Sequence, residues 1–332
     1  MIVLGIETSC DDTSAAVYDG QSLLSNVVST QLVHRRFGGI VPELASRSHI
    51  QIIIPVIKQA LSEAGVALKD LSGIAVTYGP GLAGSLLVGL SVAKGMALSL
   101  GTSLVGINHL EGHIWANSLA HPQLEPPFIV LIASGGHTQV VHVRAWGHYA
   151  VLGRTRDDAS GEAFDKVGKL MGIGYPGGPA IEKLARDGDP TYVRFPRAFL
   201  EEGSLDFSFS GLKTAVLNHV RAIGPAATQD HLNDIAVCFQ EAVIDVLTQK
   251  TIEGARRAGA SHLCLAGGVA VNKALQERLV GFGEKEGFKV WWPSPALCTD
   301  NGGMIARAGY YYLQRNIRSP MSLSPIPSLN LS

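Results

Sequence analysis

The chain begins with Ile2-Val3-Leu4-Gly5-Ile6-Glu7-Thr8-Ser9-Cys10-Asp11-Asp12-Thr13-Ser14-Ala15-Ala16-Val17-Tyr18 directly after its first methionine, and this stretch indicates the fold class. Residues 2–6 form an apolar run that predicts a strand, residues 8–13 are small and polar, and residues 14–18 again favour a strand. We therefore predict a β-hairpin whose turn carries two adjacent carboxylates.

A second stretch repeats this design about 125 residues further along the chain. Residues 128–133 predict an apolar strand, Ser134-Gly135-Gly136-His137-Thr138 a tight turn, and residues 139–143 another strand. Two hairpins of the same kind suggest two related lobes, one that opens at residue 1 and one that opens near residue 126.

Strands and helices alternate through the rest of the chain, which is typical of α/β architecture. We expect helices over residues 52–64, 83–100, 235–253, 272–280 and 304–312. We expect strands over residues 73–77, 104–107 and 262–266. Residues 319–332 are rich in serine and proline and predict a flexible or extended tail.

The composition excludes an intrinsically disordered chain. The protein has 332 residues, of which 46% are hydrophobic and 17% charged, and its net charge is −1. Disordered chains combine low hydrophobicity with high net charge, and domains that coat nucleic acid through bulk charge have an isoelectric point above about 9. The charge balance therefore predicts at most a small basic path, with the candidates Arg35, Arg36, Arg47, Arg154, Arg156, Lys166, Arg194, Arg197 and Lys213.

Several features indicate a cytoplasmic protein that is not anchored in a membrane. The four cysteines lie far apart, which favours reduced thiols, and the N-terminus lacks the basic segment of a signal peptide. Residues 71–93 carry no charge and are long enough to span a bilayer. Because Tyr78-Gly79-Pro80-Gly81 is a turn signal and Lys94 ends the stretch, we expect a buried strand, a turn and a helix there.

The stretch His109-Leu110-Glu111-Gly112-His113 is the strongest candidate for a metal site. Histidines at positions i and i+4 lie on one face of a helix, so both imidazoles can bind one ion. The central glutamate does not match the metalloprotease patterns HExxH and HxxEH. Asp300, which precedes an apolar helix, is either an N-cap or an oxygen ligand that completes a two-histidine site. The spacing also leaves open that both histidines are structural.

Glycine-rich turns give weaker signals. Residues 79–84 fit the pattern GxGxxG, but no acidic residue follows at the distance expected for a dinucleotide-binding fold, which favours a tight turn. Glycines at residues 134–138, 175–179 and 267–268, the last just before Asn272, are typical either of a nucleotide cleft or of buried turns. The chain contains neither a GxSxG nor a Walker A motif.

Ten motifs occur in order over residues 1–312. They are GIETSCDDT at residues 5–13, PELASR at 42–47, GPGL at 79–82, HLEGH at 109–113, SGGHT at 134–138, GEAFDK at 161–166, YPGGP at 175–179, FSFSGLKT at 207–214, AGGV at 266–269 and CTDNG at 298–302. With these motifs the chain resembles the bacterial TsaD family of tRNA adenosine threonylcarbamoyltransferases. Departures are small, such as Asn108 where many relatives carry another histidine before His109.

This resemblance implies an α/β fold with two RNase H-like lobes of the actin/sugar-kinase/heat-shock-ATPase superfold and a cleft between them. We place the first lobe at residues 1–125 and 302–318, the second lobe at residues 126–301, and a flexible Ser/Pro tail at residues 319–332. The implied reaction transfers a threonylcarbamoyl group from threonylcarbamoyl-AMP to the exocyclic amine of adenosine 37 in tRNAs that read ANN codons.

The resemblance also implies the residues of the site. One divalent metal, Fe(II) or Zn(II), is expected on His109, His113 and Asp300. The adenylate is expected on Ile132, Ala133, Ser134, Gly135, Gly136, Asp165, Gly178, Glu182 and Asn272. We expect Asp11 or Asp12 to accept the proton of the attacking amine, with Glu7 and Glu111 as alternatives.

The implied partners are tRNA, a TsaB-like paralogue and a TsaE-like ATPase, with the adenylate supplied by a TsaC-type synthase. Other functions remain open at this point. An ATPase or phosphotransferase, or a non-catalytic nucleotide-binding scaffold, would have the same superfold. A phosphotransferase usually holds Mg(II) through oxygen ligands, which the two histidines do not match. A metalloprotease is the most distant alternative.

Overall fold

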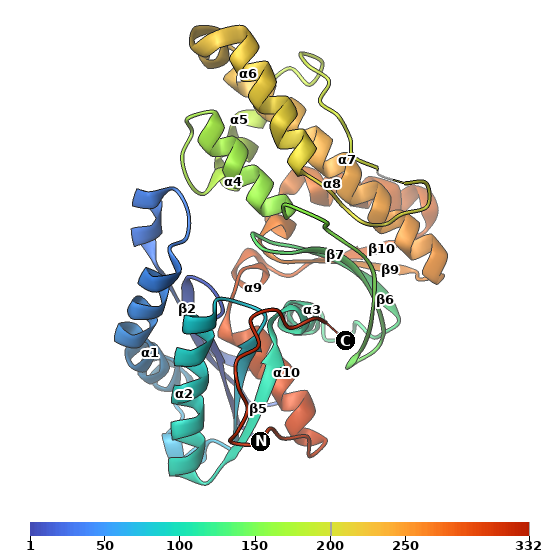
Figure 1. Cartoon of the computed structure of the whole chain (residues 1–332). Helices are drawn as coiled ribbons and strands as arrows, with labels where there is room; N and C mark the ends of the chain where they lie inside the picture. Colours follow the sequence, from blue (N-terminus) through green and yellow to red (C-terminus); the bar gives the residue numbers. More distant parts are fainter. Residues whose placement is uncertain (200, 332) are drawn as a thin grey trace. The chain divides into compact units, whose positions relative to one another are not determined.

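The computed structural model of the chain describes residues 1–199 and 201–331 and divides into two compact units (Figure 1). Unit 1 contains Met1–Leu124 and Pro293–Leu331, and unit 2 contains Glu125–Trp292. The structure differs here from the predicted division, which returned to the first lobe only at residue 302. The short helix α9 (Pro295–Cys298) contacts helix α3 of unit 1, so Asp300 belongs to unit 1.

Unit 1 is built on a five-stranded mixed sheet in the order β3-β2-β1-β4-β5. Its strands are β1 (Val3–Glu7), β2 (Asp12–Tyr18), β3 (Leu23–Thr30), β4 (Gly73–Gly79) and β5 (Ser103–Asn108). Strand β1 is antiparallel to β2, with Glu7 opposite Ser14, and parallel to β4 on its other side. The predicted N-terminal hairpin is therefore confirmed.

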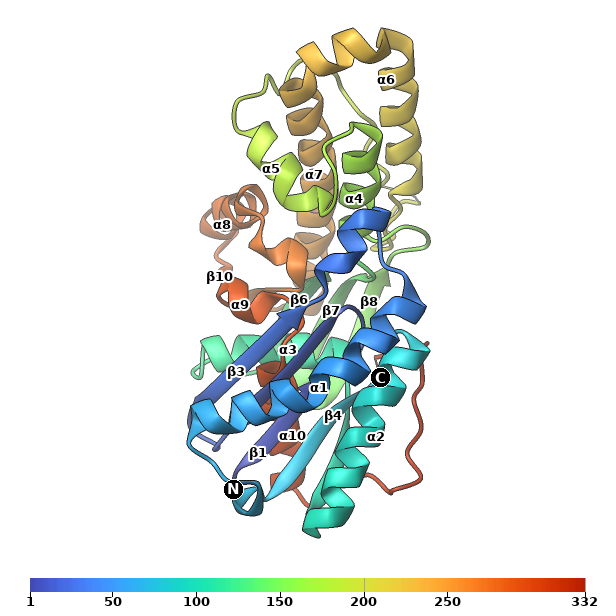
Figure 2. The ribbon, with the colours of Figure 1, turned by 90° about the vertical axis from the view of Figure 1, so that its left-hand side faces the viewer.

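Helices cover both faces of this sheet (Figure 2). Helices α1 (Pro42–Ala64) and α2 (Ala83–Leu100) pack on one face, and α3 (His109–Ala120) and α10 (Gly302–Gln314) lie on the other. Because side chains alternate along a strand, Leu4 and Ile6 join the apolar cluster under α1 and α2, whereas Gly5 faces α10. Two short 3-10 helices, η1 (Leu32–Phe37) and η2 (Leu68–Asp70), complete the unit.

Helix α2 is long and apolar enough to cross a membrane by length and composition alone. In unit 1 it packs against β4 and α1, and it buries Leu86, Leu90 and Ala93. The structure therefore shows the strand, turn and helix that the sequence predicts for this uncharged stretch.

Unit 2 repeats the sheet of unit 1. Its strands are β6 (Phe128–Ala133), β7 (Thr138–Ala145), β8 (His148–Arg154), β9 (His262–Ala266) and β10 (Lys289–Trp291), in the order β10-β9-β6-β7-β8. Strand β6 is antiparallel to β7 and parallel to β9, as β1 is to β2 and β4. The shared strand order and directions confirm the relation between the two hairpins.

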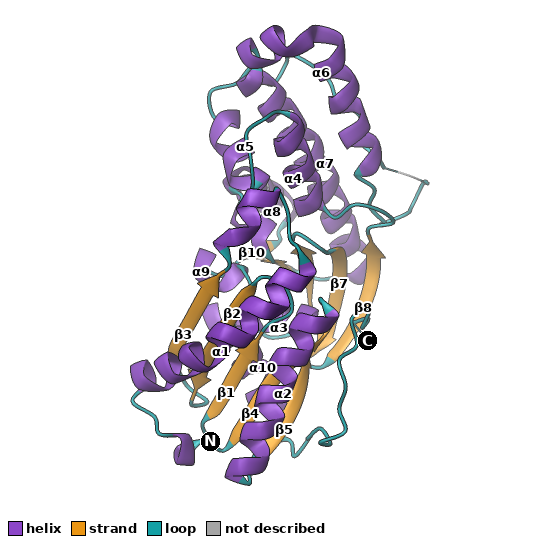
Figure 3. Ribbon diagram, turned by 60° about the vertical axis from the view of Figure 1, so that its left-hand side comes forward, coloured by secondary structure: helices purple, strands orange, loops and turns teal. Residues whose placement is uncertain are grey.

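Helix α7 (Leu232–Ala258) packs on the sheet of unit 2 and contacts β6, β7 and β9. Around it lie α4 (Ser160–Leu170), α5 (Gly177–Ala185), α6 (Ser210–Asp230), α8 (Lys273–Glu286) and the 3-10 turn η3 (Gly268–Val271) (Figure 3). Helix α6, which the periodicity did not predict, is kinked at Gly224, whose φ is 80°, just before Pro225.

The C-terminal segment Ser319–Leu331 is extended, which is one of the two forms that the sequence predicts, and it is docked on unit 1, so the flexible alternative is wrong. The Ser319 amide donates a hydrogen bond to the Leu104 carbonyl (2.8 Å), and the Ile326 amide donates to the Tyr78 carbonyl (2.8 Å). Strand β5 is an edge of the sheet, and its Leu104 carbonyl is one of the groups that hold this segment; Tyr78 belongs to the neighbouring strand β4. We call Ser319–Leu331 the C-terminal strap.

Glycines let helix α10 approach the sheet closely. A Cβ atom on Gly5 would overlap the backbone of Gly302 and Ala306, and a Cβ atom on Gly309 would overlap the side chain of Ala75. Helix α10 follows Asp300 directly, so this close packing also fixes the position of the Asp300 loop.

Replacing Gly5 with alanine is expected to destabilise the protein by roughly 1–3 kcal/mol, because α10 must shift to accept the extra atom. Urea denaturation measures this effect. Gly95→Ala in α2 is the matched control, because a Cβ there meets open space and should stabilise the helix by about 0.5–1 kcal/mol. Equal stability of the two variants would contradict the packing described for α10.

Candidate functional site

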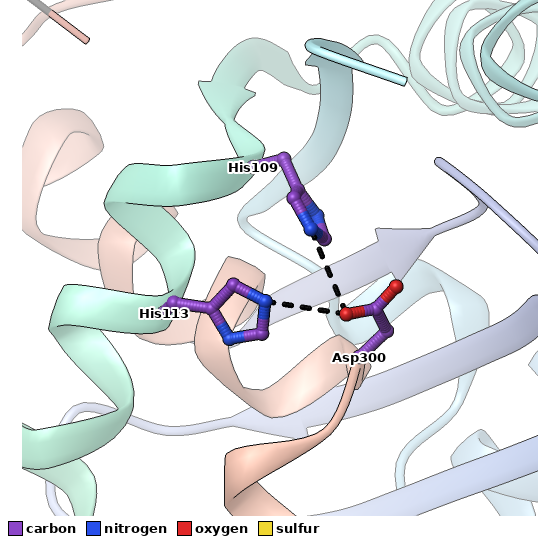
Figure 4. A group of neighbouring side chains, drawn as sticks. All are labelled: His109, His113 and Asp300. Carbon is purple, nitrogen blue, oxygen red and sulfur yellow. Dashed lines mark ion pairs between the residues drawn. The ribbon is translucent and has the colours of Figure 1, made fainter. Parts of the chain in front are cut away.

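Three side chains of unit 1 form a candidate metal centre. His109 and His113 project from the first two turns of α3 toward Asp300, which lies between α9 and α10 (Figure 4). The Oδ1 atom of Asp300 lies 3.2 Å from Nε2 of His113 and 3.6 Å from Nε2 of His109. The three ligand atoms lie within 4.8 Å of one another, so two nitrogens and one oxygen can bind the same ion.

The environment of His113 fits a metal ligand better than a structural histidine. Its side chain is fully buried, and neither ring nitrogen has a hydrogen-bond partner in the described part of the chain, beyond the approach to Asp300. A buried polar atom without a partner costs free energy, and coordination would remove that cost. Two imidazoles and one carboxylate suit Zn(II) or Fe(II) and leave coordination positions for a substrate.

A buried carboxylate orients the other histidine. The Nδ1 atom of His109 lies 3.0 Å from Oε2 of Glu7 and 3.1 Å from Oγ of Ser9, while the hydroxyl of Thr77 donates to Oε2 of Glu7 (2.6 Å). Hydrogen bonding at Nδ1 directs Nε2 toward Asp300. Burial lowers the pKa of His109, but the carboxylates of Asp300 and Glu7 outweigh it and raise that pKa to about 9.

Glu111, which stands between the two histidines in the sequence, serves a different purpose. Its carboxylate accepts hydrogen bonds from the Tyr312 hydroxyl and from Nε1 of Trp115, and so it connects α3 to α10. Gly112 beside it allows close packing, because a Cβ there would lie 2.8 Å from Cδ1 of Ile305. Glu111 is therefore held in the packing between the two helices.

The two carboxylates of the N-terminal hairpin turn lie near the metal ligands. Burial, followed by the negative charge of Asp300, raises the pKa of Asp12 to about 7. The same two causes, in the same order, raise the pKa of Asp11. The Oδ1 atom of Asp12 is buried and has no hydrogen-bond partner among the described residues. The structure thus brings Asp11 and Asp12 close to the candidate metal centre, within unit 1.

The residues expected to hold the adenylate all lie in unit 2. In the β6–β7 turn the Ser134 amide donates to the His137 carbonyl (2.8 Å), and Gly135 and Gly136 are exposed. The side chains of Ile132 and Ala133 are buried in β6, so these two residues can offer a ligand only their main chain.

The remaining adenylate candidates surround η3, which contacts β6, β9, α4 and α8. Asp165 accepts a hydrogen bond from the Gly177 amide (2.7 Å), next to Gly178 at the start of α5. Glu182 accepts one from the Lys273 amide (3.0 Å). Asn272 caps α8 by accepting from the Leu275 amide, and it also donates to Gln240. Each of these three polar side chains therefore supports the local backbone or a neighbouring side chain.

Several of the basic candidates are paired with acidic side chains. Lys166 and Lys213 contact Asp158, at 2.7 and 3.4 Å. Arg156 pairs with Glu201 and Asp206, and Arg197 pairs with Asp245. Arg36, Arg47, Arg154 and Arg194 are exposed, and the side chain of Arg35 lies outside the described part of the structure. The pairing reduces the positive charge that these residues offer to a polyanion.

Sequence reasoning did not identify the residues that support the metal ligands. The sequence indicates Glu7 only as a candidate proton acceptor. Its position at the end of the first strand is a local signal for a side chain near the site. The contact between Glu111 and Tyr312 joins residues 201 positions apart and left no local pattern.

Comparisons with known proteins show the family of the chain. The profile of the family described as "TsaD: tRNA N6-adenosine threonylcarbamoyltransferase" matches residues 22–307. Two curated proteins named "tRNA N6-adenosine threonylcarbamoyltransferase" are similar to the chain over almost its full length. The protein of Clostridium perfringens is 52% identical over 99% of this chain and 98% of its own length. The protein of Desulfitobacterium hafniense is 54% identical over 99% of this chain and 97% of its own length.

Solved structures with low sequence identity share the fold. The component A of (R)-2-hydroxyglutaryl-CoA dehydratase from Acidaminococcus fermentans has a TM-score of 0.57 at 14% identity, covering 95% of this chain and 98% of its own. The HypF protein of T. kodakarensis has a TM-score of 0.63 at 15% identity, covering 95% of this chain and 48% of its own. The expected α/β class with two similar lobes is confirmed.

Replacing Glu7 with glutamine is expected to weaken metal binding about 10- to 100-fold, the usual effect of losing a carboxylate behind a metal-binding histidine. Competition with a chromophoric chelator for Zn(II) measures the dissociation constant. His113→Ala should abolish stoichiometric binding because it removes a ligand. Unchanged Zn(II) affinity in both variants would exclude this metal centre.

Proposed function

The chain belongs to the TsaD family of tRNA N6-adenosine threonylcarbamoyltransferases, and we propose that it transfers threonylcarbamoyl from threonylcarbamoyl-AMP to the N6 amine of adenosine 37 in tRNAs that read ANN codons. It is a transferase that modifies tRNA. The single observation that carries the detailed proposal is the cluster of buried His109 and His113 with half-buried Asp300, beside two carboxylates of raised pKa.

We assign His109, His113 and Asp300 as the residues that hold one Zn(II) or Fe(II) ion. Such an ion supplies Lewis-acid polarisation of a carbonyl or phosphoryl oxygen. Glu7 keeps the ring of His109 in the orientation that presents Nε2, and Glu111 keeps α3 against α10. The chain therefore provides a preorganised centre that need not rearrange during the reaction.

Asp12 is the proposed proton acceptor. In the transfer, the N6 nitrogen forms a bond to the acyl carbon, the bond from that carbon to the phosphate oxygen breaks, AMP leaves, and one N6 proton passes to a base. Asp12 suits this role because it has a buried, unpartnered Oδ1 atom and a pKa near neutrality. Glu7 and Glu111 suit it less, because Glu7 orients the ring of His109 and Glu111 is held by Trp115 and Tyr312.

The adenylate is proposed to bind unit 2 at the turns around η3. Gly135 and Gly136 are exposed and have open space where a Cβ would stand, so their amides are accessible to an anion. Asp165, Gly178, Glu182 and Asn272 lie on the helices next to these turns, where their contacts fix the shape of the surface. Ile132, Ala133 and Ser134 contribute the strand and the start of the turn.

The proposed partners are a TsaB-like paralogue, a TsaE-like ATPase and a TsaC-type synthase that supplies the adenylate. The proposed location is the cytoplasm. The faces of α1 and α2 that point away from the sheet offer an apolar surface for the paralogue. Ile50 and Ile54 lie one turn apart on α1 and are 64% and 44% exposed, and Leu87 on α2 is 55% exposed.

The family assignment replaces the earlier alternatives of a phosphotransferase, a scaffold and a metalloprotease. Mass spectrometry of tRNA nucleosides after depletion of this protein tests the function most simply. We expect threonylcarbamoyladenosine to disappear and to return with the wild-type chain, but not with His113→Ala. Full activity of a metal-stripped variant with alanine at His109, His113 and Asp300 would disprove the proposed metal role.

Asp12→Asn is expected to lower kcat/KM by about 100- to 10,000-fold, the usual contribution of a general base. In the wild-type enzyme the rate should fall as the pH drops through the pKa of Asp12, because only the carboxylate accepts a proton. A cation on Asp300 offsets one cause of the raised pKa, so this fall should lie at or below about pH 7.

A pH–rate profile of the reconstituted reaction makes this measurement, with Asp11→Asn as the matched control. We expect the control to retain the acidic limb of the profile. Loss of that limb in Asp11→Asn, with retention in Asp12→Asn, would assign the base to Asp11 instead.

A further inference from the structure

The C-terminal strap follows an edge of unit 1 and ends beside the start of α3, as the red segment in Figure 1 shows. It begins at Ser319, whose amide and hydroxyl bond to Leu104 and Gly106 of β5. It continues past Tyr78 at the end of β4 and reaches Asn108 at the start of α3. Its last described residue, Leu331, is buried.

The glycine-rich turn after β4 accommodates the strap. A Cβ on Gly79 would overlap the Ile326 carbonyl, and a Cβ on Gly106 would lie 2.6 Å from Cδ2 of Leu323. The Gly81 amide donates a hydrogen bond to the Pro327 carbonyl (3.1 Å). Gly79 and Gly81 belong to the GxGxxG pattern of residues 79–84. The space beside Gly79 is filled by the strap and the space beside Gly81 by Ser9, so the pattern here serves the packing of the chain itself.

Lys94 fastens the middle of the strap. It is the sole charged residue in the sequence of α2, and its ammonium group donates a hydrogen bond to the Leu323 carbonyl. Hydrogen bonds from a charged donor are stronger than those between neutral groups. The position of one lysine in an otherwise apolar helix is thus explained by the strap.

The end of the strap bonds to Asn108, the N-cap residue of α3. The Nδ2 group of Asn108 donates to the Asn330 carbonyl (3.0 Å), and its Oδ1 atom accepts from the amides of Leu110 (2.9 Å) and Glu111 (3.4 Å). The strap therefore holds the amide of Asn108 in the orientation that caps α3. His109 is the next residue, so this cap fixes the turn that carries the first metal ligand.

A second connection runs from the same turn to His109. The Leu82 amide donates to the Ser9 carbonyl (2.8 Å), and the Ser9 hydroxyl lies 3.1 Å from Nδ1 of His109. Gly81, which bonds to the strap, also packs against Ser9 so closely that a Cβ would lie 2.8 Å from that residue's Cβ. The strap thus supports His109 from the start of its helix and from the side of its ring.

We propose that the C-terminal strap, fastened by Lys94 and bonded to Asn108, is a positioning element that sets the metal-binding geometry of His109. Lys94 and Asn108 are positioning residues in this account, since neither is a metal ligand. The inference rests on the proposed metal function of His109, His113 and Asp300. Its chemical consequence is that the far end of the sequence determines how tightly the ion is held.

The test compares full-length variants of Lys94 by their Co(II) spectra and Co(II) affinities, since Co(II) is a visible substitute for Zn(II) or Fe(II). Lys94→Met removes the donor to Leu323 and should weaken Co(II) binding roughly 10-fold, the lower end of the effect of losing a supporting partner. It should also alter the ligand-field bands and accelerate amide hydrogen exchange over residues 319–331. Lys94→Arg should restore the Co(II) affinity, the ligand-field bands and the slow amide exchange. Lys58→Met, on the exposed face of α1, should change none of these three measurements.

A chain that ends at Arg318 provides a second variant, with circular dichroism to verify its fold. Its Co(II) affinity should fall as in Lys94→Met and should recover when a peptide of residues 319–332 is added. Faster exchange over the strap with unchanged Co(II) affinity and spectrum would overturn the proposal and leave the strap a purely structural element. A wild-type chain that binds no Co(II) at all would instead refute the metal centre, and the inference with it.

Discussion

One buried hydrogen bond, from the ring of His109 to the carboxylate of Glu7, joins the two features on which the site depends. Glu7 ends the first strand of the sheet, and His109 begins the helix that carries both candidate metal-binding histidines. Because Glu7 is fully buried and also accepts from Thr77, the ring of His109 has a fixed direction before any ligand arrives. The rest of unit 1 brings Asp300 to the same point.

Asp300 reaches that point through the packing of α10. Glycines at positions 5, 302 and 309 let this helix lie directly against the sheet, and the Tyr312 hydroxyl bonds to Glu111 of α3. Asn301, the residue after Asp300, caps α10 and leaves the Asp300 side chain to face the histidines. Residues about 200 positions apart in the sequence therefore form one candidate metal centre, with Asp300 as the proposed carboxylate ligand and other carboxylates in support.

The two units have the same sheet but different chemistry. Each places a tight turn between its first two strands, and the residues of that turn differ: the turn of unit 1 carries Asp11 and Asp12, and the turn of unit 2 carries Gly135 and Gly136. Two carboxylates suit proton transfer near a cation, whereas exposed glycine amides suit an anion. A repeated fold thus presents two complementary kinds of site.

Local patterns in the sequence were sufficient to predict the hairpins, the α/β class and the two histidines on one helix face, because each depends on residues within about one element. The position of residues 293–301 in unit 1 and the docking of the strap could not be predicted in this way. Both depend on contacts between distant segments, such as Asn108 with Asn330, that leave no periodic signal. The candidate residues Asp165 and Glu182 came from resemblance alone, whereas the glycine turn at residues 267–268 also indicated Asn272. The hydrogen bonds of all three follow from the packing of helices around η3.

X-ray absorption spectroscopy of the metal-loaded protein tests the central claim most directly. The account predicts imidazole scattering from two histidines and a light-atom shell at about 2.0–2.2 Å, as expected for nitrogen and oxygen ligands of Zn(II). A shell of oxygen atoms only, or one that contains sulfur, would contradict the assignment of His109, His113 and Asp300 as the metal centre.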